Sequence, residues 1–268
     1  MKLYHYTTLD SFAKIWVSKQ LKFSPSQNTN DLFEREKLFH ILHQFMYDLR
    51  PSDFNIPAKE YWDSFNTILY SFKQISLVAD YNDTPGYKSP LMWGHYAHND
   101  QGVCIEFEYE KLPKLEDIYS SEVSYVTKVP FVNIPRPIRC GENEIRNLIL
   151  ENQKAFFFTK HKHWEYENEF RFVSDKSEAL SINQAITCVY VADCHHVNTK
   201  VVEQLVRDEV HVQSVATYMF SNSKGLPNID LTAMQALGTI DYSNAMFSTH
   251  KNILLHTPGA RNTMQNYK

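Results

Sequence analysis

Three short polar and aromatic segments, far apart in the sequence, carry the residue types that chemistry needs. They are Leu3–Thr7, Met92–Ala97 and Trp164–Arg171, and each lies within a hydrophobic stretch. In order, they contribute a histidine, a tyrosine and a glutamate. An imidazole, a phenol and a carboxylate together can hold a ribose and stabilise the positive charge that develops when a glycosidic bond breaks. If the fold brings the segments together, they suit the cleavage of such a bond in a nucleotide cofactor.

The segment Trp164–Arg171 gives the strongest signal. In an extended strand Glu165, Glu167, Glu169 and Arg171 share one face, because side chains alternate. Three carboxylates on one face repel each other, which is unusual for a solvated strand, although a surface ladder of salt bridges is the alternative. In a ligand site, one carboxylate would bind a ribose hydroxyl or stabilise a sugar cation. Arg171 would hold a neighbouring carboxylate or a phosphate.

His5 lies near the end of a predicted first strand, where its imidazole can face a cleft. The alternative is a structural histidine bound to a backbone carbonyl. A polar loop follows at 23–34 and leads into a helix. Asn30 and Asp31 in this loop either present polar groups to a phosphate or ribose, or cap the helix.

In the segment Met92–Ala97, helical spacing places Trp93, Tyr96 and Ala97 on one side and His95 on the other. Trp93 is expected to pack in the core. Tyr96 either packs beside it or stacks its ring on a bound base while its hydroxyl stays in a polar environment.

Two further groups contain metal-binding residue types, His161-x-His163 and Cys194-His195-His196. Such spacings are common, and neither has the second ligand pair that a zinc site requires. We therefore predict no metal site.

The composition is typical of a cytoplasmic globular protein. Of the 268 residues 43% are apolar, and the formal net charge of −4 provides no overall basic field for non-specific nucleic-acid binding. Binding of single-stranded nucleic acid in a local basic groove stays an open alternative. The four cysteines show no CxxC spacing, the first residues read as a strand, and no apolar run approaches the ~18 residues of a membrane span. We expect reduced thiols, no targeting peptide and no membrane contact.

The hydrophobic pattern predicts an α+β fold, with a single mixed-sheet domain and helical insertions over residues 1–220. Residues 221–268 read as an irregular C-terminal extension. Alternation over 102–109 predicts a half-buried strand with Cys104, Glu106 and Glu108 on its polar side. The other strands are expected at 2–6, 21–24, 75–79, 121–129, 169–173, 185–192 and 210–219, and the helices at 9–19, 31–49, 58–72, 90–98, 142–159 and 198–208.

Over roughly residues 1–220 the chain resembles a large bacterial family of proteins with a domain of unknown function. The motifs that carry the resemblance are Tyr4–Thr7, Asn30–Glu34, Met92–Phe107 and Trp164–Arg171. The sequence departs from the family's pattern at Leu32, where the family usually has proline, and this should alter how the loop enters the following helix.

More distantly, the chain resembles the ADP-ribosyltransferase superfamily, especially the DarT-type enzymes that modify nucleic acids. These open with a similar strand, here His5-Tyr6-Thr7, and use a late glutamate on a strand for catalysis. That glutamate would be Glu169, with Glu167 as the second choice. The resemblance implies an ADP-ribosyltransferase-like fold and NAD as the substrate.

On this resemblance the catalytic residues would be Glu169, His5 and Tyr96, with the nicotinamide ribose near His5. Arg171 and the Asn30-Asp31 loop would hold the diphosphate. The full set of implied NAD contacts is His5, Tyr6, Thr7, Asn30, Asp31, Trp93, Tyr96, Glu167 and Arg171.

The implied function is NAD-dependent ADP-ribosylation of a nucleic acid or protein, in a bacterial toxin or phage-defence effector with an antitoxin as partner. Two alternatives stay open. One is a non-catalytic nucleotide- or RNA-binding sensor, and the other is a nuclease that uses Glu165, Glu167 and Glu169 with a divalent ion.

Overall fold

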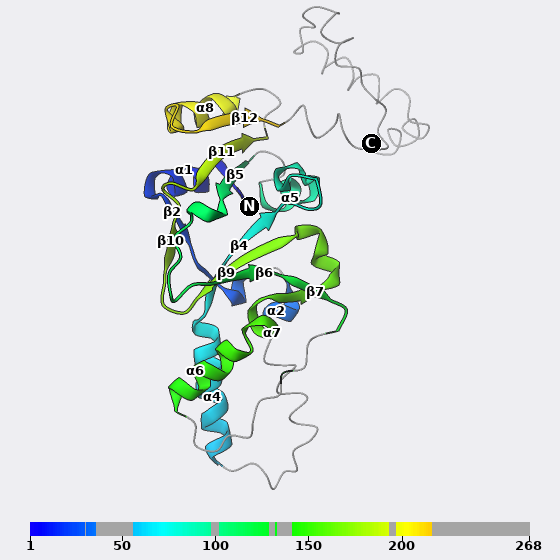
Figure 1. The fold of residues 1–268 in the computed structure, drawn as a ribbon, viewed down its shortest axis with the longest axis vertical. Coiled ribbons are helices and arrows are strands. Elements are labelled where there is room, and N and C mark those ends of the chain that lie inside the picture. The colour runs from blue at the N-terminus through cyan, green and yellow to red at the C-terminus, as the bar shows by residue number, and fades with distance from the viewer. Residues whose placement is uncertain are drawn as a thin grey trace, which may run out of the picture. The chain divides into compact units, whose positions relative to one another are not determined.

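The computed structural model describes residues 1–29, 31–35, 56–97, 102–128, 132, 141–192 and 197–215. At the centre of this part of the chain is a mixed β-sheet with the strand order β12–β11–β5–β1–β4–β9–β6, and β3 pairs with β4 outside this path (Figure 1). Its strands are β1 (Lys2–Thr7), β3 (Ser24–Pro25), β4 (Lys73–Ala79), β5 (Val103–Glu108), β6 (Tyr119–Glu122), β9 (Glu169–Ser174), β11 (Ile186–Val191) and β12 (His211–Ser214).

Strands β11 and β12 run parallel, with helix α8 (Val197–Val206) between them in the chain, and the other described ladders of this sheet are antiparallel. The strands expected near 185–192 and 210–219 and the helix expected at 198–208 are thus found as β11, β12 and α8. The predicted α+β class with a mixed sheet is confirmed as well.

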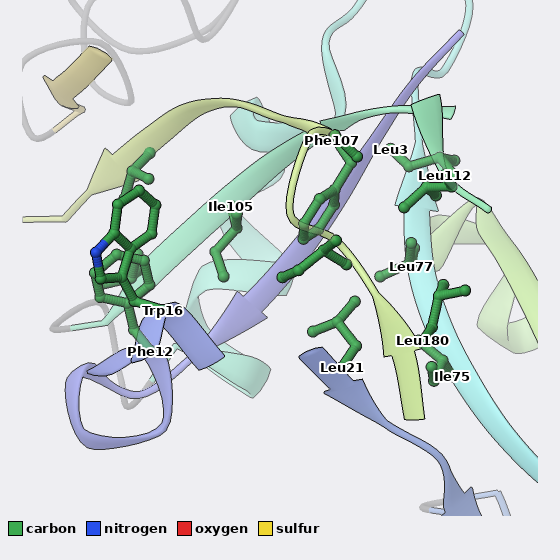
Figure 2. Close-up of a cluster of buried hydrophobic side chains, with 14 of the residues drawn as sticks. Leu3, Phe12, Trp16, Leu21, Ile75, Leu77, Ile105, Phe107, Leu112 and Leu180 are labelled. Carbon is green, nitrogen blue, oxygen red and sulfur yellow. The ribbon is translucent and has the colours of Figure 1, made fainter. Parts of the chain in front are cut away.

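One face of the sheet packs against helix α1 (Leu9–Ser18) and α8. Phe12 and Trp16 of α1 lie near Ile105 of β5, and Leu21 lies near Leu77 in the same buried cluster (Figure 2). Helix α1 begins as expected, because the Thr8 side chain accepts a hydrogen bond from the Ser11 backbone N–H.

The other face of the sheet packs against helix α5 (Pro90–Tyr96). This helix places Met92 and Trp93 against Tyr4 and Tyr6 of β1, and the Tyr6 and Trp93 rings meet edge to face with centroids 5.1 Å apart. Because side chains alternate along β1, Leu3 and His5 lie on the α1 side while Tyr4 and Tyr6 lie on the α5 side.

A third buried cluster lies at the helices predicted as insertions. Helix α4 (Ile56–Ser71) and helix α6 (Glu142–Glu151) lie side by side, and α7 (Gln153–Phe157) follows α6 (Figure 1). Phe65, Ile149 and Phe157 are among the side chains that these helices bury together. The helical insertions are thus anchored by their own apolar contacts.

Two predicted elements are shorter than expected. The helix at 142–159 is interrupted at Asn152, whose side chain donates to the Leu148 carbonyl and ends α6. After α7 the chain forms β8 (Thr159–His161), which pairs in parallel with β7 (Ser124–Val126). The strand at 121–129 likewise divides at Val123 into β6 and β7.

The half-buried character predicted for 102–109 is wrong. Both faces of β5 are covered, because Ile105 and Phe107 lie in the buried cluster with α1 and α8 and Cys104 lies in the cluster with α5, and Glu106 is buried as well. Glu106 is tolerated there because Thr187, Tyr190 and Lys2 all contact its carboxylate.

The feature of the sheet that matters most for a site is the short contact between β1 and β4. Their ladder comprises Leu3 with Ala79 and Tyr4 with Val78. Further along β4, β3 takes the place of β1 and pairs with Gln74 and Lys73. Between these two pairings the strands part. The short β2 (Gln20–Lys22) follows α1 at this point and pairs with β10 (Ala179–Ser181).

Several predictions fall outside the described residues. Of the helix expected at 31–49, the structure describes α2 (Leu32–Arg35). The extension at 221–268 lies outside, so the proposed domain boundary stays a prediction. None of the helices in the described ranges combines the length and apolar character that a membrane span needs.

Candidate active site

A cavity of about 710 Å³ lies where β1 and β4 part. This volume falls within the range of ~300–1,000 Å³ that is usual for small-molecule sites. All three sequence segments line the cavity. The residues from these segments are Tyr4, His5, Tyr6, Thr7, Met92, Tyr96, Glu167, Glu169 and Arg171. The expected meeting of the segments is therefore observed.

Tyr96 and Glu167 form the contact between the second and third segments. The Tyr96 hydroxyl donates to Glu167 Oε1 at 2.6 Å. On the other carboxylate oxygen, Glu167 Oε2 accepts a hydrogen bond from Lys160 Nζ at 2.5 Å. Each oxygen of this buried carboxylate thus has one partner, which leaves further acceptor capacity on both.

Glu169 is bound more completely than Glu167. Arg171 donates to both of its oxygens, from Nε at 2.7 Å and from Nη2 at 2.8 Å. Burial acts to raise the pKa of Glu169, but the charge and hydrogen bonds of Arg171 outweigh it and lower the pKa to about 2, with Lys160 and Ser76 contributing. Glu169 is therefore ionised at neutral pH and held in a fixed geometry.

Arg171 is fully buried and committed to protein groups. Besides Glu169, its Nη1 lies 2.6 Å from Glu34 Oε1 and donates to the Phe157 carbonyl. Of its two predicted roles, the structure thus shows Arg171 holding neighbouring carboxylates. Its contact with Glu34 fixes α2 beside β9, and α2 follows the loop that forms part of the cavity wall.

The expected face of four charged side chains on one strand is wrong in part. Residues Lys162–Glu167 form a 3₁₀ helix, and β9 begins only at Glu169. Asn168 makes the transition with φ 41° and donates its side-chain amide to the Ala79 and Asp80 carbonyls. As a result Glu167 and Glu169 enter the cavity, whereas Glu165 is exposed and lines another cavity of about 420 Å³.

His5 is half-buried in the cavity lining on the α1 side of β1. Burial lowers the pKa of His5 to about 4, although a hydrogen bond to the Ser76 backbone opposes the shift. The imidazole is therefore neutral at physiological pH. This bond matches the structural alternative foreseen for a histidine at this position, and it leaves one ring nitrogen for a ligand.

Other expected NAD contacts have roles within the fold. Trp93 is fully buried, donates from Nε1 to the Tyr87 carbonyl, and does not line the cavity, so it is a core residue. The Tyr6 hydroxyl donates to the Gly86 carbonyl at 2.6 Å. Thr7 is buried in the cavity lining.

The loop predicted to meet a phosphate contributes less than expected. Asp31 is buried directly before α2 and is not part of the cavity lining, as suits the helix-capping alternative. Asn30 lies outside the described residues. Asn28 and Thr29, just before it, do line the cavity.

The sequence reasoning missed four charged residues of the cavity. Lys160 and Glu34 are buried beside the two carboxylates. Lys14 on α1 and Lys22 on β2 are exposed in the lining, together with hydroxyl and amide side chains of Ser11, Ser18, Gln20 and Ser24. Lys160 follows the apolar run Ala155–Phe158 closely, and Glu34 ends the motif Asn30–Glu34, but neither position indicates a partner, and the spacing of Lys14 and Lys22 gives no signal.

The cavity thus has two chemically different walls. One wall, from α5, β8, the 3₁₀ helix Lys162–Glu167 and β9, carries the carboxylates of Glu167 and Glu169. The other, from α1 and β2, carries the ammonium groups of Lys14 and Lys22. Such a lining suits a ligand with a positive group at one place and a negative group at another.

A divalent ion does not suit the carboxylate wall, because Lys160 and Arg171 are bound to the carboxylates of Glu34, Glu167 and Glu169 and leave them one formal negative charge in total. His161 Nδ1 accepts from the His163 backbone N–H, which is a capping contact. Across the described ranges, no group of three or more His, Cys, Asp or Glu side chains is placed to hold a metal ion.

Comparison with solved structures finds a distant likeness to a DarT from Thermus sp. 2.9, solved in complex with ADP-ribosylated ssDNA. The two chains share 11% identity, and the match covers 80% of this chain and 93% of the other with a TM-score of 0.33. At this level the likeness carries no conclusion about activity. A search of curated protein sequences gives no match.

A family model gives a match in sequence over residues 92–172. This stretch contains the second and third segments and also Lys160, and the resemblance to a family of unknown function is confirmed. Over residues 92–172 the chain is similar to the family described as "Protein of unknown function (DUF2971)".

Proposed function

We propose that the protein is an NAD-dependent ADP-ribosyltransferase, which breaks the bond between nicotinamide and ribose and transfers ADP-ribose to a nucleic acid or a protein. The observation that carries the proposal is the convergence of His5, Tyr96, Glu167 and Glu169 on one cavity. These are the residue types expected around a ribose whose glycosidic bond is cleaved.

The two walls of the cavity support NAD as the substrate. NAD carries a positive nicotinamide ring and a negative diphosphate. The ring and its ribose fit the carboxylate wall, and the diphosphate fits the wall with Lys14 and Lys22. Because Arg171 is fully buried against carboxylates, these lysines replace it as the proposed diphosphate contacts.

Glu167 is the better candidate for the reacting carboxylate. Glu169 accepts from Arg171 on both oxygens and from Lys160 on one of them, whereas Glu167 accepts one hydrogen bond on each oxygen. We assign Glu167 to stabilise the positive charge that develops on the ribose, and Glu169 to fix Arg171 and Lys160 beside it. The neutral His5 ring is assigned to bind a ribose hydroxyl.

The test is release of nicotinamide from NAD by the purified protein, alone and with single-stranded DNA, RNA or cell lysate. The matched pair of variants is Glu167→Gln and Glu165→Gln. Glu165 is exposed and lies outside the proposed site, so the same chemical change there is the control. Glu167→Gln should lose ~10²-fold or more in rate, a size typical of a group that stabilises transition-state charge, and Glu165→Gln should keep it.

The acceptor follows from the same experiment. Release that needs DNA, RNA or lysate, with label from NAD appearing on the added molecule, would identify a transferase and its acceptor class. Release into water alone would indicate an NAD glycohydrolase. If NAD binds without any release, the non-catalytic sensor becomes the better description. A toxin or phage-defence role with an antitoxin partner stays a prediction from the resemblance.

A further inference from the structure

Lys160 is a buried lysine that the proposed chemistry does not yet use. It is the middle residue of β8, lies opposite Tyr125 of β7, and is 7% exposed. Its ammonium lies 4.7 Å from the centroid of the Trp164 ring. A lysine is rarely buried unless its charge is paired, so the partners of this ammonium indicate why it is there.

Those partners are the two carboxylates of the site. Lys160 Nζ lies 2.5 Å from Glu167 Oε2 and 3.4 Å from Glu169 Oε2. Glu169 also pairs with Arg171, and so does Glu34. Among the ion pairs of the described residues, Glu167 pairs with Lys160. Removing the ammonium would therefore leave Glu169 paired and Glu167 without a counter-charge.

Lys160 is not suited to act as a base or a nucleophile. Burial acts to lower its pKa, but the carboxylates of Glu169, Glu34 and Glu167 outweigh burial and raise it. The ammonium is thus protonated at neutral pH, and its effect is exerted through charge and hydrogen bonding.

We infer that Lys160 is a positioning residue for Glu167, which fixes the orientation of the carboxylate and supplies its counter-charge while Tyr96 holds the other oxygen. The inference rests on the proposed function for the part that Glu167 plays in the reaction. A buried carboxyl group that loses its counter-charge favours its neutral form, and a neutral carboxyl group no longer stabilises positive charge. The titratable and charged groups around Glu167 are Tyr96 from α5, Lys160 from β8, Glu169 and Arg171 from β9, Glu34 from α2, Tyr125 from β7 and the neighbouring Tyr166.

The experiment compares Lys160→Met, which keeps the apolar stem without the charge, with Lys160→Arg, which keeps the charge. Two quantities are measured on the full chain. The first is the pKa of the Glu167 carboxyl group by NMR with ¹³C-labelled glutamate, assigned with Glu167→Gln. The second is the pH dependence of nicotinamide release.

In Lys160→Met we expect the Glu167 pKa to rise by roughly one to three units, as for loss of a close opposite charge. The acid limb of the rate profile should move to higher pH by a similar amount. Lys160→Arg should restore both toward the wild-type values. A role in packing alone would lower the rate at every pH without moving the limb.

If Lys160→Met does not fold, the double variant Lys160→Met with Glu167→Gln provides the second measurement. It removes both charges, so it should regain the fold if the lost stability comes from the unpaired Glu167. A Glu167 pKa that is unchanged in folded Lys160→Met, or a double variant that stays unfolded, would overturn the inference. If the wild type releases no nicotinamide, the proposed function fails, and the NMR titration still decides the role of Lys160.

Discussion

The Tyr96 hydroxyl and Glu167 Oε1 are joined by a 2.6 Å hydrogen bond across 71 residues of sequence. The bond connects the last residue of α5 with the last residue of the 3₁₀ helix before β9. A phenol and a carboxylate that come from different segments thus act as a pair at the carboxylate wall of the cavity.

The first prediction concerns this pair. Tyr96→Phe removes the donor and keeps the ring, so Glu167 should lose one of the two bonds that orient it. We expect nicotinamide release to fall by about 10- to 100-fold, the size that loss of a hydrogen bond to a charged group implies. The binding of NAD should change less than the rate. The measurement is a steady-state comparison with wild type, and equal rates would show that the hydroxyl does not position Glu167.

The second prediction concerns Arg171, which is fully buried between Glu169 and Glu34. Arg171→Met removes the cation that pairs with buried Glu34 and leaves Glu169 with the longer contact to Lys160, and this should reduce the free energy of unfolding by about 3–5 kcal/mol. Arg171→Lys keeps the charge but not the two-point contact, so its loss should be smaller. Urea denaturation of both variants measures the difference. If Arg171→Met is as stable as wild type, the network does not support the fold.

The third prediction uses two glycines with different surroundings. A Cβ on Gly86 would clash with the Tyr4 ring and would lie 3.0 Å from the Ala79 carbonyl oxygen. Gly86→Ala should therefore lose about 1–3 kcal/mol of stability. Gly94, in α5, has nothing within 4 Å of the same atom, so Gly94→Ala should gain up to ~1 kcal/mol from helix propensity. Thermal unfolding of the two variants distinguishes these outcomes by sign.

The fourth prediction concerns the pH dependence of stability at His5. Its pKa is about 4 in the folded protein, against an ordinary value of 6.5. As the pH falls, the unfolded chain takes up this proton first. The contribution of His5 is therefore complete above pH 6.5 and is lost as the pH falls to 4.

This dependence is measured as the difference in unfolding free energy between wild type and His5→Gln at several pH values. As the pH falls from 6.5 to 4, the unfolding free energy of the wild type should decrease more than that of His5→Gln. The imidazole NMR signals of His5 provide a direct check. Signals that titrate near the ordinary value would contradict the burial of this ring.

The part of the candidate site that comes from a single short segment could be predicted from the sequence. Glu167, Glu169 and Arg171 stand two apart, and they do reach the same cavity. Their backbone was predicted less well, because the 3₁₀ helix Lys162–Glu167 and the left-handed Asn168 interrupt the strand. Asparagine tolerates such a conformation, but nothing in the alternation of charges indicates it.

The partners of these residues were not predictable. Glu34 and Lys160 meet Arg171 and Glu167 only because α2 packs against β8, and β8 packs against the 3₁₀ helix Lys162–Glu167. The burial of β5 escaped prediction for the same reason, since Glu106 is satisfied by Lys2, Thr187 and Tyr190 from other strands. Periodicity predicts which side of an element is apolar, and it does not predict which polar groups find partners in the fold.

The parting of β1 and β4 has a consequence for recognition. Every β-strand has two hydrogen-bonding edges. One edge of β1 pairs with β5, and one edge of β4 pairs with β9. Over the stretch between the Tyr4–Val78 pair and β3, the facing edges carry no ladder between the two strands. A ligand that reached these edges would meet peptide groups, which every amino acid supplies alike, although His5 already bonds the Ser76 backbone there. This part of its binding would survive changes in the side chains around it, whereas the choice between ligands would depend on the charged residues of the two walls.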